Sequence, residues 1–234
     1  MELFSSGWWS ALLAIVLIDL VLAGDNAIVI ALAARNLPSH LQKRAIVWGT
    51  FGAIAVRSVM TIGVVWLLRI PGLMLVGGLG LVWIAYKLLA PAGEEGEGGH
   101  KPVAHTFWGA MKTIVIADAL MGIDNVLGVA GAAKGSFDLV VIGLLISVPI
   151  VVWGSTLVLK LVERFPIITY AGAGVLAYTA AHMIVSEPLL DEVFDPNLLA
   201  RLATYAVLVA GVLGAGWWTA RRSQQHQEPG PTAA

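Results

Sequence analysis

Residues 18–26 read IDLVLAGDN, and residues 117–125 read ADALMGIDN. Both stretches contain an aspartate, then five further residues, then an Asp-Asn pair, and both lie inside long apolar runs. A cation follows ten residues after the second aspartate of each copy, Arg35 in the first and Lys134 in the second. A motif that occurs twice with this spacing indicates a chain built from two copies of one unit.

The apolar runs around the two motifs have the length of membrane spans. A helix needs about 20 predominantly apolar residues to cross a bilayer. Turn-forming residues separate the runs, as at Pro38, Pro71, Pro166 and Pro196. We therefore predict an all-α polytopic membrane protein with seven transmembrane helices, at roughly 8–34, 43–68, 72–90, 106–133, 138–162, 167–187 and 198–220.

Each copy of the motif begins a unit of three predicted helices. The likeness continues downstream, since Arg69-Ile70-Pro71 of the first unit matches Arg164-Phe165-Pro166 of the second. Because three is an odd number, the second unit enters the membrane from the opposite side, as in the inverted-topology repeats of many secondary transporters. We predict one transmembrane domain over 1–222, made of repeat one at 8–90, repeat two at 106–187 and a seventh helix at 198–220.

The composition agrees with a membrane protein and excludes several other classes. Hydrophobic residues make up 58% of the chain and charged residues 12%, which is roughly half the charged share of soluble domains. The formal net charge of -1 gives no electrostatic reason to expect nucleic acid as a partner. The chain has no cysteine, so disulfides and thiolate metal sites are excluded.

The distribution of Lys and Arg predicts the orientation. With the N-terminus outside and the C-terminus inside, ten of these cations fall on the inner side and three on the outer side, as the positive-inside rule requires. This orientation places a flexible loop at 91–105 and a disordered tail at 223–234 in the cytoplasm. It places an acidic loop outside, with Glu187, Asp191, Glu192 and Asp195.

The N-terminal stretch is read as the first span, retained in the mature protein. It lacks the basic segment of a cleavable signal peptide, and its apolar run contains Asp19 and Asp25.

The motif aspartates and asparagines are the candidate metal ligands. A carboxylate in hydrocarbon is costly and usually faces a cavity or a partner. A local break at Gly24 would turn Asp25 toward the face that Asp19 and Asn26 share. Oxygen ligands of this kind suit Mg²⁺, Ca²⁺ or Mn²⁺, and the same carboxylates exchange protons. The predicted metal site consists of Asp19, Asp25, Asn26, Asp118, Asp124 and Asn125.

Two further side chains have open roles. Arg57 lies in the middle of the second predicted span, either as a structural counter-ion or as a charge-balancing group for transport. His182, in the sixth, is either a proton relay or extra ligand, or a hydrogen-bonded interior histidine. The aspartates have an alternative reading too, as polar contacts between helices that pair with Arg57 and with each other.

No arrangement of nucleophile and base and no phosphate-binding loop is apparent in the sequence. The doubled motif does not resemble the paired motifs of intramembrane aspartyl proteases. We predict that the protein is not an enzyme and that it holds no permanently bound cofactor.

The stretches Leu17–Ala27 and Asp118–Val126 resemble the paired motifs of the TerC family of integral membrane proteins, in its YjbE-type branch. The resemblance covers about residues 8–220, and its motifs show no departure from the family pattern. It implies a seven-helix fold related to the lysine-exporter superfamily and a place in the bacterial cytoplasmic (inner) membrane. It also implies manganese efflux, as for several bacterial members, or the supply of metal to exported enzymes, as for others.

The expected function is therefore export of a divalent cation, Mn²⁺ first, by proton antiport through the paired aspartates. Two rivals stay open at this point. One is an exporter of Ca²⁺ or a small cationic solute, and the other is a non-transporting membrane partner of a secretion or metalation complex. The expected partners are the cation and the lipid bilayer, and the sequence leaves open whether the chain forms a homo-oligomer.

Overall fold

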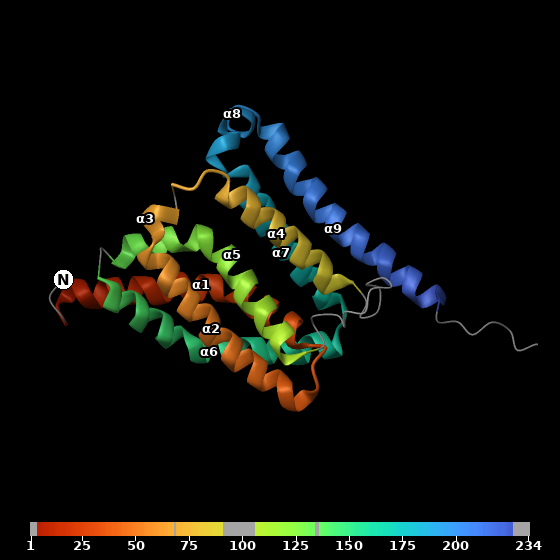
Figure 1. The fold of residues 1–234 in the computed structure, drawn as a ribbon, viewed down its shortest axis with the longest axis horizontal. Helices are drawn as coiled ribbons and strands as arrows, with labels where there is room; N and C mark the ends of the chain where they lie inside the picture. Colours follow the sequence, from red (N-terminus) through yellow and green to blue (C-terminus); the bar gives the residue numbers. More distant parts are fainter. Residues whose placement is uncertain (1–3, 68, 91–105, 134–135, 227–234) are drawn as a thin grey trace, which may run out of the picture.

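The computed structural model describes residues 4–67, 69–90, 106–133 and 136–226, apart from the side chains of 21–23, 65, 124, 127, 137 and 223–226. All regular structure in these ranges is helical (Figure 1). The elements are α1 (Ser6–Ala34), α2 (Ser39–Ile62), α3 (Val64–Leu67), α4 (Leu73–Leu89), α5 (Phe107–Ala133), α6 (Phe137–Arg164), α7 (Ile167–Val185), η2 (Pro188–Leu190), α8 (Asp191–Phe194) and α9 (Leu198–His226).

Every predicted apolar stretch forms a helix, and most ends agree within a few residues. The second stretch is divided, because α2 ends at Ile62 and the short α3 follows Gly63. The last helix continues to His226, so the first four residues of the predicted tail are helical; glutamine, present twice there, is a good helix former. The predicted loop at 91–105 and residues 227–234 of the predicted tail lie outside the described residues.

The helices give four to five candidate membrane spans. Four helices are long and apolar enough to cross a bilayer, at Ser39–Ile62, Asp138–Arg164, Ile167–Val185 and Leu198–Arg222. The two arms of α1, Ser6–Leu20 and Gly24–Ala34, meet at an angle of 48° and count as a fifth span if taken together. The helix α4 is apolar but has only 17 residues. The chain is thus a multi-pass helical membrane protein, and the predicted total of seven spans stays a prediction.

Two pairs of helices pack closely through glycine. The helix α1 lies along α6, and α5 lies along α2 (Figure 1). Ile15 of α1 fills the space where a side chain at Gly143 of α6 would lie, and Ile114 of α5 does the same at Gly49 of α2. Small residues at such crossings let helices approach closely, which is how helices associate in lipid.

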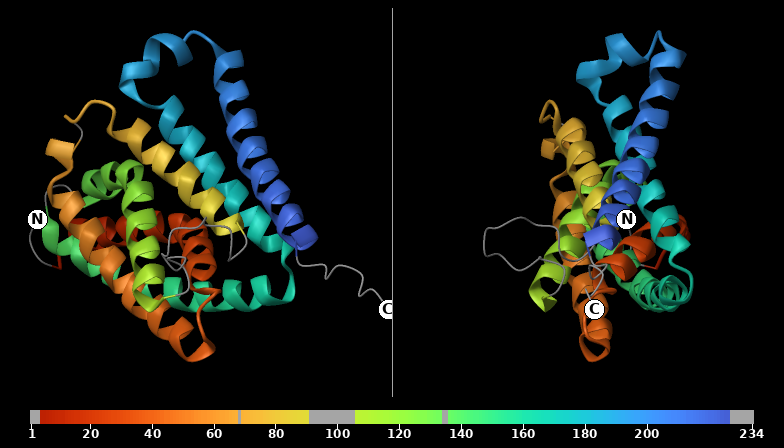
Figure 2. Two further views of the ribbon diagram at one scale, coloured as in Figure 1. Left: turned by 45° about the vertical axis from the view of Figure 1, so that its right-hand side comes forward. Right: turned by 90° about the vertical axis from the view of Figure 1, so that its right-hand side faces the viewer.

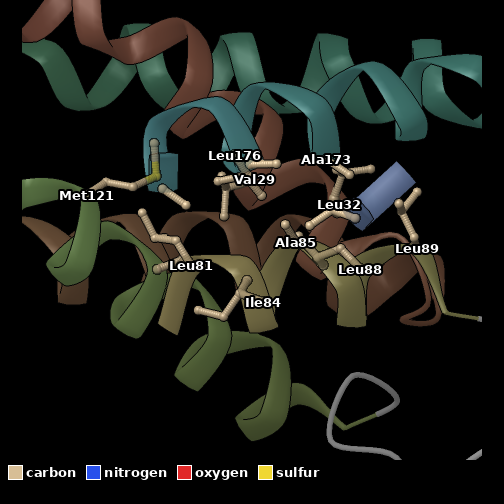
Figure 3. Packing of buried hydrophobic residues seen from close by; sticks show 14 of the residues in the cluster. Val29, Leu32, Leu81, Ile84, Ala85, Leu88, Leu89, Met121, Ala173 and Leu176 are labelled. Atoms are coloured by element: carbon tan, nitrogen blue, oxygen red, sulfur yellow. The ribbon is translucent and has the colours of Figure 1, made fainter. Parts of the chain in front are cut away.

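The helices α4, α7 and α9 form a second group beside these pairs. Gly77 and Gly78 of α4 face Met183 and Ile184 of α7, and apolar side chains of α1, α4, α5 and α7 close the core (Figure 3). The helix α9 packs on α7 and α4 and follows the outer edge of the molecule (Figure 2). Its remaining surface exposes large apolar side chains such as Leu199 and Val207, as expected for contact with lipid.

Candidate functional site

Arg57 joins the first aspartates of the two motifs. Its guanidinium donates one hydrogen bond from Nη1 to Oδ1 of Asp19 in α1, at 2.5 Å, and another from Nη2 to Oδ1 of Asp118 in α5. All three side chains are buried, with exposed fractions of 3% for Asp19, 3% for Arg57 and 7% for Asp118. The planar, forked guanidinium suits this double pairing, which a lysine ammonium would not reproduce.

The position of Arg57 follows from the buried face of α2. Thr50, Ala53, Arg57 and Thr61 follow one another at helical spacing, and all four are buried. Thr61 donates from Oγ1 to the carbonyl of Arg57 at 2.8 Å. The packing of α2 against α5 and α1 thus presents the guanidinium to both aspartates.

Several buried oxygen atoms of this region have no hydrogen-bond partner among the described residues. They are Oδ2 of Asp118, Oδ1 of Asn26 and Oγ1 of Thr50, and Nε of Arg57 also lacks an acceptor. Asn26 is seven residues beyond Asp19 and Thr50 is seven before Arg57, so on antiparallel helices both fall on the same side of the bridge. Buried acceptors without a donor are costly, and a bound cation or a proton would satisfy them.

Asp25, the second aspartate of the first motif, lies six residues beyond Asp19 on α1. Its side chain is half-buried, and its Oδ1 accepts the backbone N–H of Asn26 at 3.0 Å. The two arms of α1 are bent by 48°, but α1 stays helical over Ser6–Ala34, so the predicted break that turns Asp25 toward Asp19 stays a prediction.

The other predicted ligands are less well defined. Asn125 is half-buried on α5, and the side chain of Asp124 lies outside the described residues. Within the described part of the chain, no three Asp, Glu or His side chains are grouped so that they could hold one metal ion. Arg57 lies between Asp19 and Asp118, so the two carboxylates are held by a cation of the protein itself. The complete six-residue shell therefore stays a prediction.

His182 lies in a different place from this cluster. It is exposed on α7, and its Nδ1 is 3.0 Å from the hydroxyl of Tyr205 in α9. The ring of Tyr205 also contacts that of Tyr178, with 5.0 Å between the ring centroids. His182 thus faces α9, whereas the bridge is built by α1, α2 and α5, and the relay role of His182 stays a prediction.

Glu187 is a polar residue that sequence reasoning placed only in the acidic loop. It is 2% exposed, and its carboxylate accepts the N–H groups of Gly72, Met74 and Leu75 at 2.9, 3.1 and 3.2 Å. Gly72 has φ of +79° and no side chain, so the first turn of α4 lacks a local cap. A carboxylate at the N-terminus of a helix satisfies these donors and favours the helix dipole. The sequence shows that α4 lacks a local cap beside Pro71, but it does not show that Glu187 supplies the acceptor.

Arg35 holds the opposite end of α4. It donates from Nη2 to the carbonyl of Leu88 at 2.8 Å and from Nη1 to Oγ1 of Thr169 in α7 at 2.9 Å. A cation at the C-terminus of a helix is the favourable arrangement for its dipole. The short helix α4 is thus held at both ends by charged side chains from elsewhere in the chain, Arg35 just after α1 and Glu187 just after α7.

We expect Glu187→Ala to destabilise the protein, because three half-buried N–H groups at the start of α4, those of Gly72, Met74 and Leu75, would lose their acceptor. The expected loss is about 2 kcal/mol of unfolding free energy. Thermal unfolding in detergent micelles measures it, with Glu192→Ala as the matched control because Glu192 is exposed on α8. Equal midpoints for the two variants would show that the cap does not stabilise the fold.

Comparisons with known proteins point to one family. Residues 4–224 match the family described as "Integral membrane protein TerC family". The uncharacterized membrane protein YjbE of Bacillus subtilis is 48% identical over 181 residues, which cover 77% of this chain and 82% of YjbE. The inner membrane protein YgdQ of Escherichia coli is 26% identical over 202 residues, which cover 80% of this chain and 82% of YgdQ. No solved structure gives a significant match.

Proposed function

The chain belongs to the TerC family of integral membrane proteins. From this premise we propose that it exports a divalent metal cation by proton antiport, with Mn²⁺ as the leading candidate. The family is one of membrane proteins and not of enzymes. The observation that carries the proposal is the buried bridge of Asp19, Arg57 and Asp118, with Oδ2 of Asp118 left without a partner among the described residues. Ionisable groups inside a membrane mark ion pathways unless they serve only to pair with each other.

The charges of the cluster match a divalent cation. The three aspartates at 19, 25 and 118 and the guanidinium of Arg57 leave a net charge of −2 when all are ionised. Hard cations such as Mn²⁺ bind carboxylate and amide oxygens, and Asp118 and Asn26 each hold one buried oxygen that is available. Cation and proton compete for the same oxygens, so entry of protons from outside would release the metal there. Asp124 and Asn125 would complete the shell from the second motif.

The helix packing supports a transporter of two inverted repeats, in which a site between the repeats opens to each side of the membrane in turn. The repeat matches α1 with α5 and α2 with α6, so the α1–α6 pair and the α5–α2 pair are equivalent. Ile15 packs on Gly143, and Ile114 packs on Gly49. These two contacts are equivalent as well, because Ile114 follows Ile15 by 99 positions, as Asp118 follows Asp19. Arg57 breaks this symmetry, because Val151 or Val152 stands at the matching position of α6. Secondary transporters bind their ions between such repeats.

We place the protein in the inner membrane, like its relative YgdQ. The Lys and Arg distribution supports an N-terminus outside and a C-terminus in the cytoplasm. The chain has no cysteine, so single introduced cysteines report their side of the membrane without background. We expect Glu192→Cys to react with an impermeant maleimide in intact cells, and Ser39→Cys to react only after permeabilisation. The reverse pattern would refute the orientation.

The proposal is tested by ⁵⁴Mn²⁺ accumulation in everted membrane vesicles, with and without a proton gradient. Export from cells corresponds to uptake into everted vesicles, and antiport predicts that uptake collapses when a protonophore is added. Vesicles without the protein provide the background. If the folded protein gives no accumulation above this background, Mn²⁺ export is excluded, and Ca²⁺ is the next cation for the same assay.

A further inference from the structure

A crevice outside the aspartate cluster lies between α4 and α5. It has a volume of about 140 Å³. Apolar side chains form much of its wall, namely Ala33, Ile84, Leu88 and Ile116. Trp83, Lys87, Lys112 and Thr113 complete the lining, so two cations border an otherwise largely apolar space, and the lining residues among those that the structure describes include no acidic one.

The lysines lie at helix ends, where a bilayer has its headgroups. Lys87 is in the last turn of α4, and Lys112 is near the start of α5. The ammonium group of Lys87 lies 4.8 Å from the ring centroid of Trp83, which is 59% exposed. Trp108, in the first turn of α5, is exposed as well. Tryptophans of this kind gather at the membrane interface, so the mouth of the crevice is at headgroup depth and its wall at the depth of the acyl chains.

We propose that the α4–α5 crevice binds an anionic phospholipid. The two ammonium groups would hold the phosphate, and the apolar wall would contact the first part of an acyl chain. A zwitterionic lipid brings its own cation to the lysines and is a poorer match. Free phosphate would leave the apolar wall without a partner. Basic pockets between membrane helices are established sites for anionic headgroups in general, and this inference is independent of the transported ion.

Native mass spectrometry of the full-length protein in detergent tests the site, by titration with dioleoyl phosphatidylglycerol. We expect Lys87→Gln/Lys112→Gln to weaken binding by at least about tenfold, because each cation near a lipid headgroup contributes to affinity. The matched control is Lys43→Gln/Arg44→Gln, which removes the same charge from exposed positions of α2 outside the crevice. This control is expected to bind as the wild type does.

Two further measurements distinguish lipid binding in the crevice from a general attraction to charge and from binding of phosphate alone. Ile116→Trp fills the crevice without a change of charge and should also weaken phosphatidylglycerol binding. Dioleoyl phosphatidylcholine should bind more weakly than phosphatidylglycerol, and glycerol phosphate should not displace the lipid at equal concentration. Equal losses in the two double variants would show a non-specific effect of charge. Displacement by glycerol phosphate, or unchanged binding by Lys87→Gln/Lys112→Gln, would also overturn the proposal.

Discussion

Asp118→Asn is expected to reduce ⁵⁴Mn²⁺ accumulation to the background of vesicles without the protein. The asparagine keeps an oxygen that accepts the hydrogen bond from Nη2 of Arg57, so the helices stay joined. It removes the negative charge and the second carboxylate oxygen, which has no partner in the described structure. A unit charge about 4 Å from a cation contributes on the order of 4 kcal/mol near a protein surface. This corresponds to roughly a thousandfold weaker binding.

The matched control for this experiment is Asp191→Asn, the same chemical change at an exposed position in α8. It should transport as the wild type does. A thermal unfolding curve of Asp118→Asn that resembles the wild type would show that the loss is one of binding and not of folding. Normal accumulation by Asp118→Asn would exclude Asp118 as a ligand.

Arg57→Leu is expected to have the largest effect on stability. Its removal leaves Asp19 and Asp118 buried without a counter-ion, and breaking a buried ion pair in this way costs about 3–5 kcal/mol. Thermal unfolding in detergent measures the loss, with Lys43→Leu as the control because Lys43 is exposed on the same helix. Arg57→Lys should be intermediate, since one ammonium lacks the fork that spans both carboxylates.

A second substitution distinguishes the bridge from a packing effect of leucine. In Arg57→Leu/Asp118→Asn one of the unpaired charges is gone, so the double variant should be more stable than Arg57→Leu alone. Such coupling is the signature of side chains that interact directly. Additive losses in the two single variants would show that the three side chains do not form one unit.

The sequence predicts the helices of this protein well because lipid imposes a simple requirement. Each span needs a long apolar run, and Pro38, Pro71 and Pro166 end such runs visibly. The break at Gly63 was not predicted, since glycine is tolerated in membrane helices and only packing decides where one ends. Residues in η2 and α8 form short turns that no period in the sequence predicts.

The site is predictable in its residue types but not in its pairing. Charges in apolar runs identify Asp19, Asp118 and Arg57 from the sequence, yet their bridge depends on how α2 lies across α1 and α5. Glu187 was beyond sequence reasoning for the same reason, because the Gly72 N–H that it accepts lies 115 positions earlier in the chain. His182 is also a titratable group within an apolar run, but its side chain faces Tyr205 of α9 and not the aspartates, and the sequence alone did not show this.

The buried guanidinium of Arg57 in the first repeat has a thermodynamic consequence for the proposed transport cycle. Two identical inverted halves would give inward-facing and outward-facing forms of equal free energy, and an unloaded carrier would rest on either side equally. A valine stands at the position of the second repeat that matches Arg57. The two forms therefore differ in which half holds the buried positive charge of Arg57. In the proposed cycle the empty protein would therefore have a preferred resting side, and the cation concentration that half-saturates transport would differ between the two sides of the membrane.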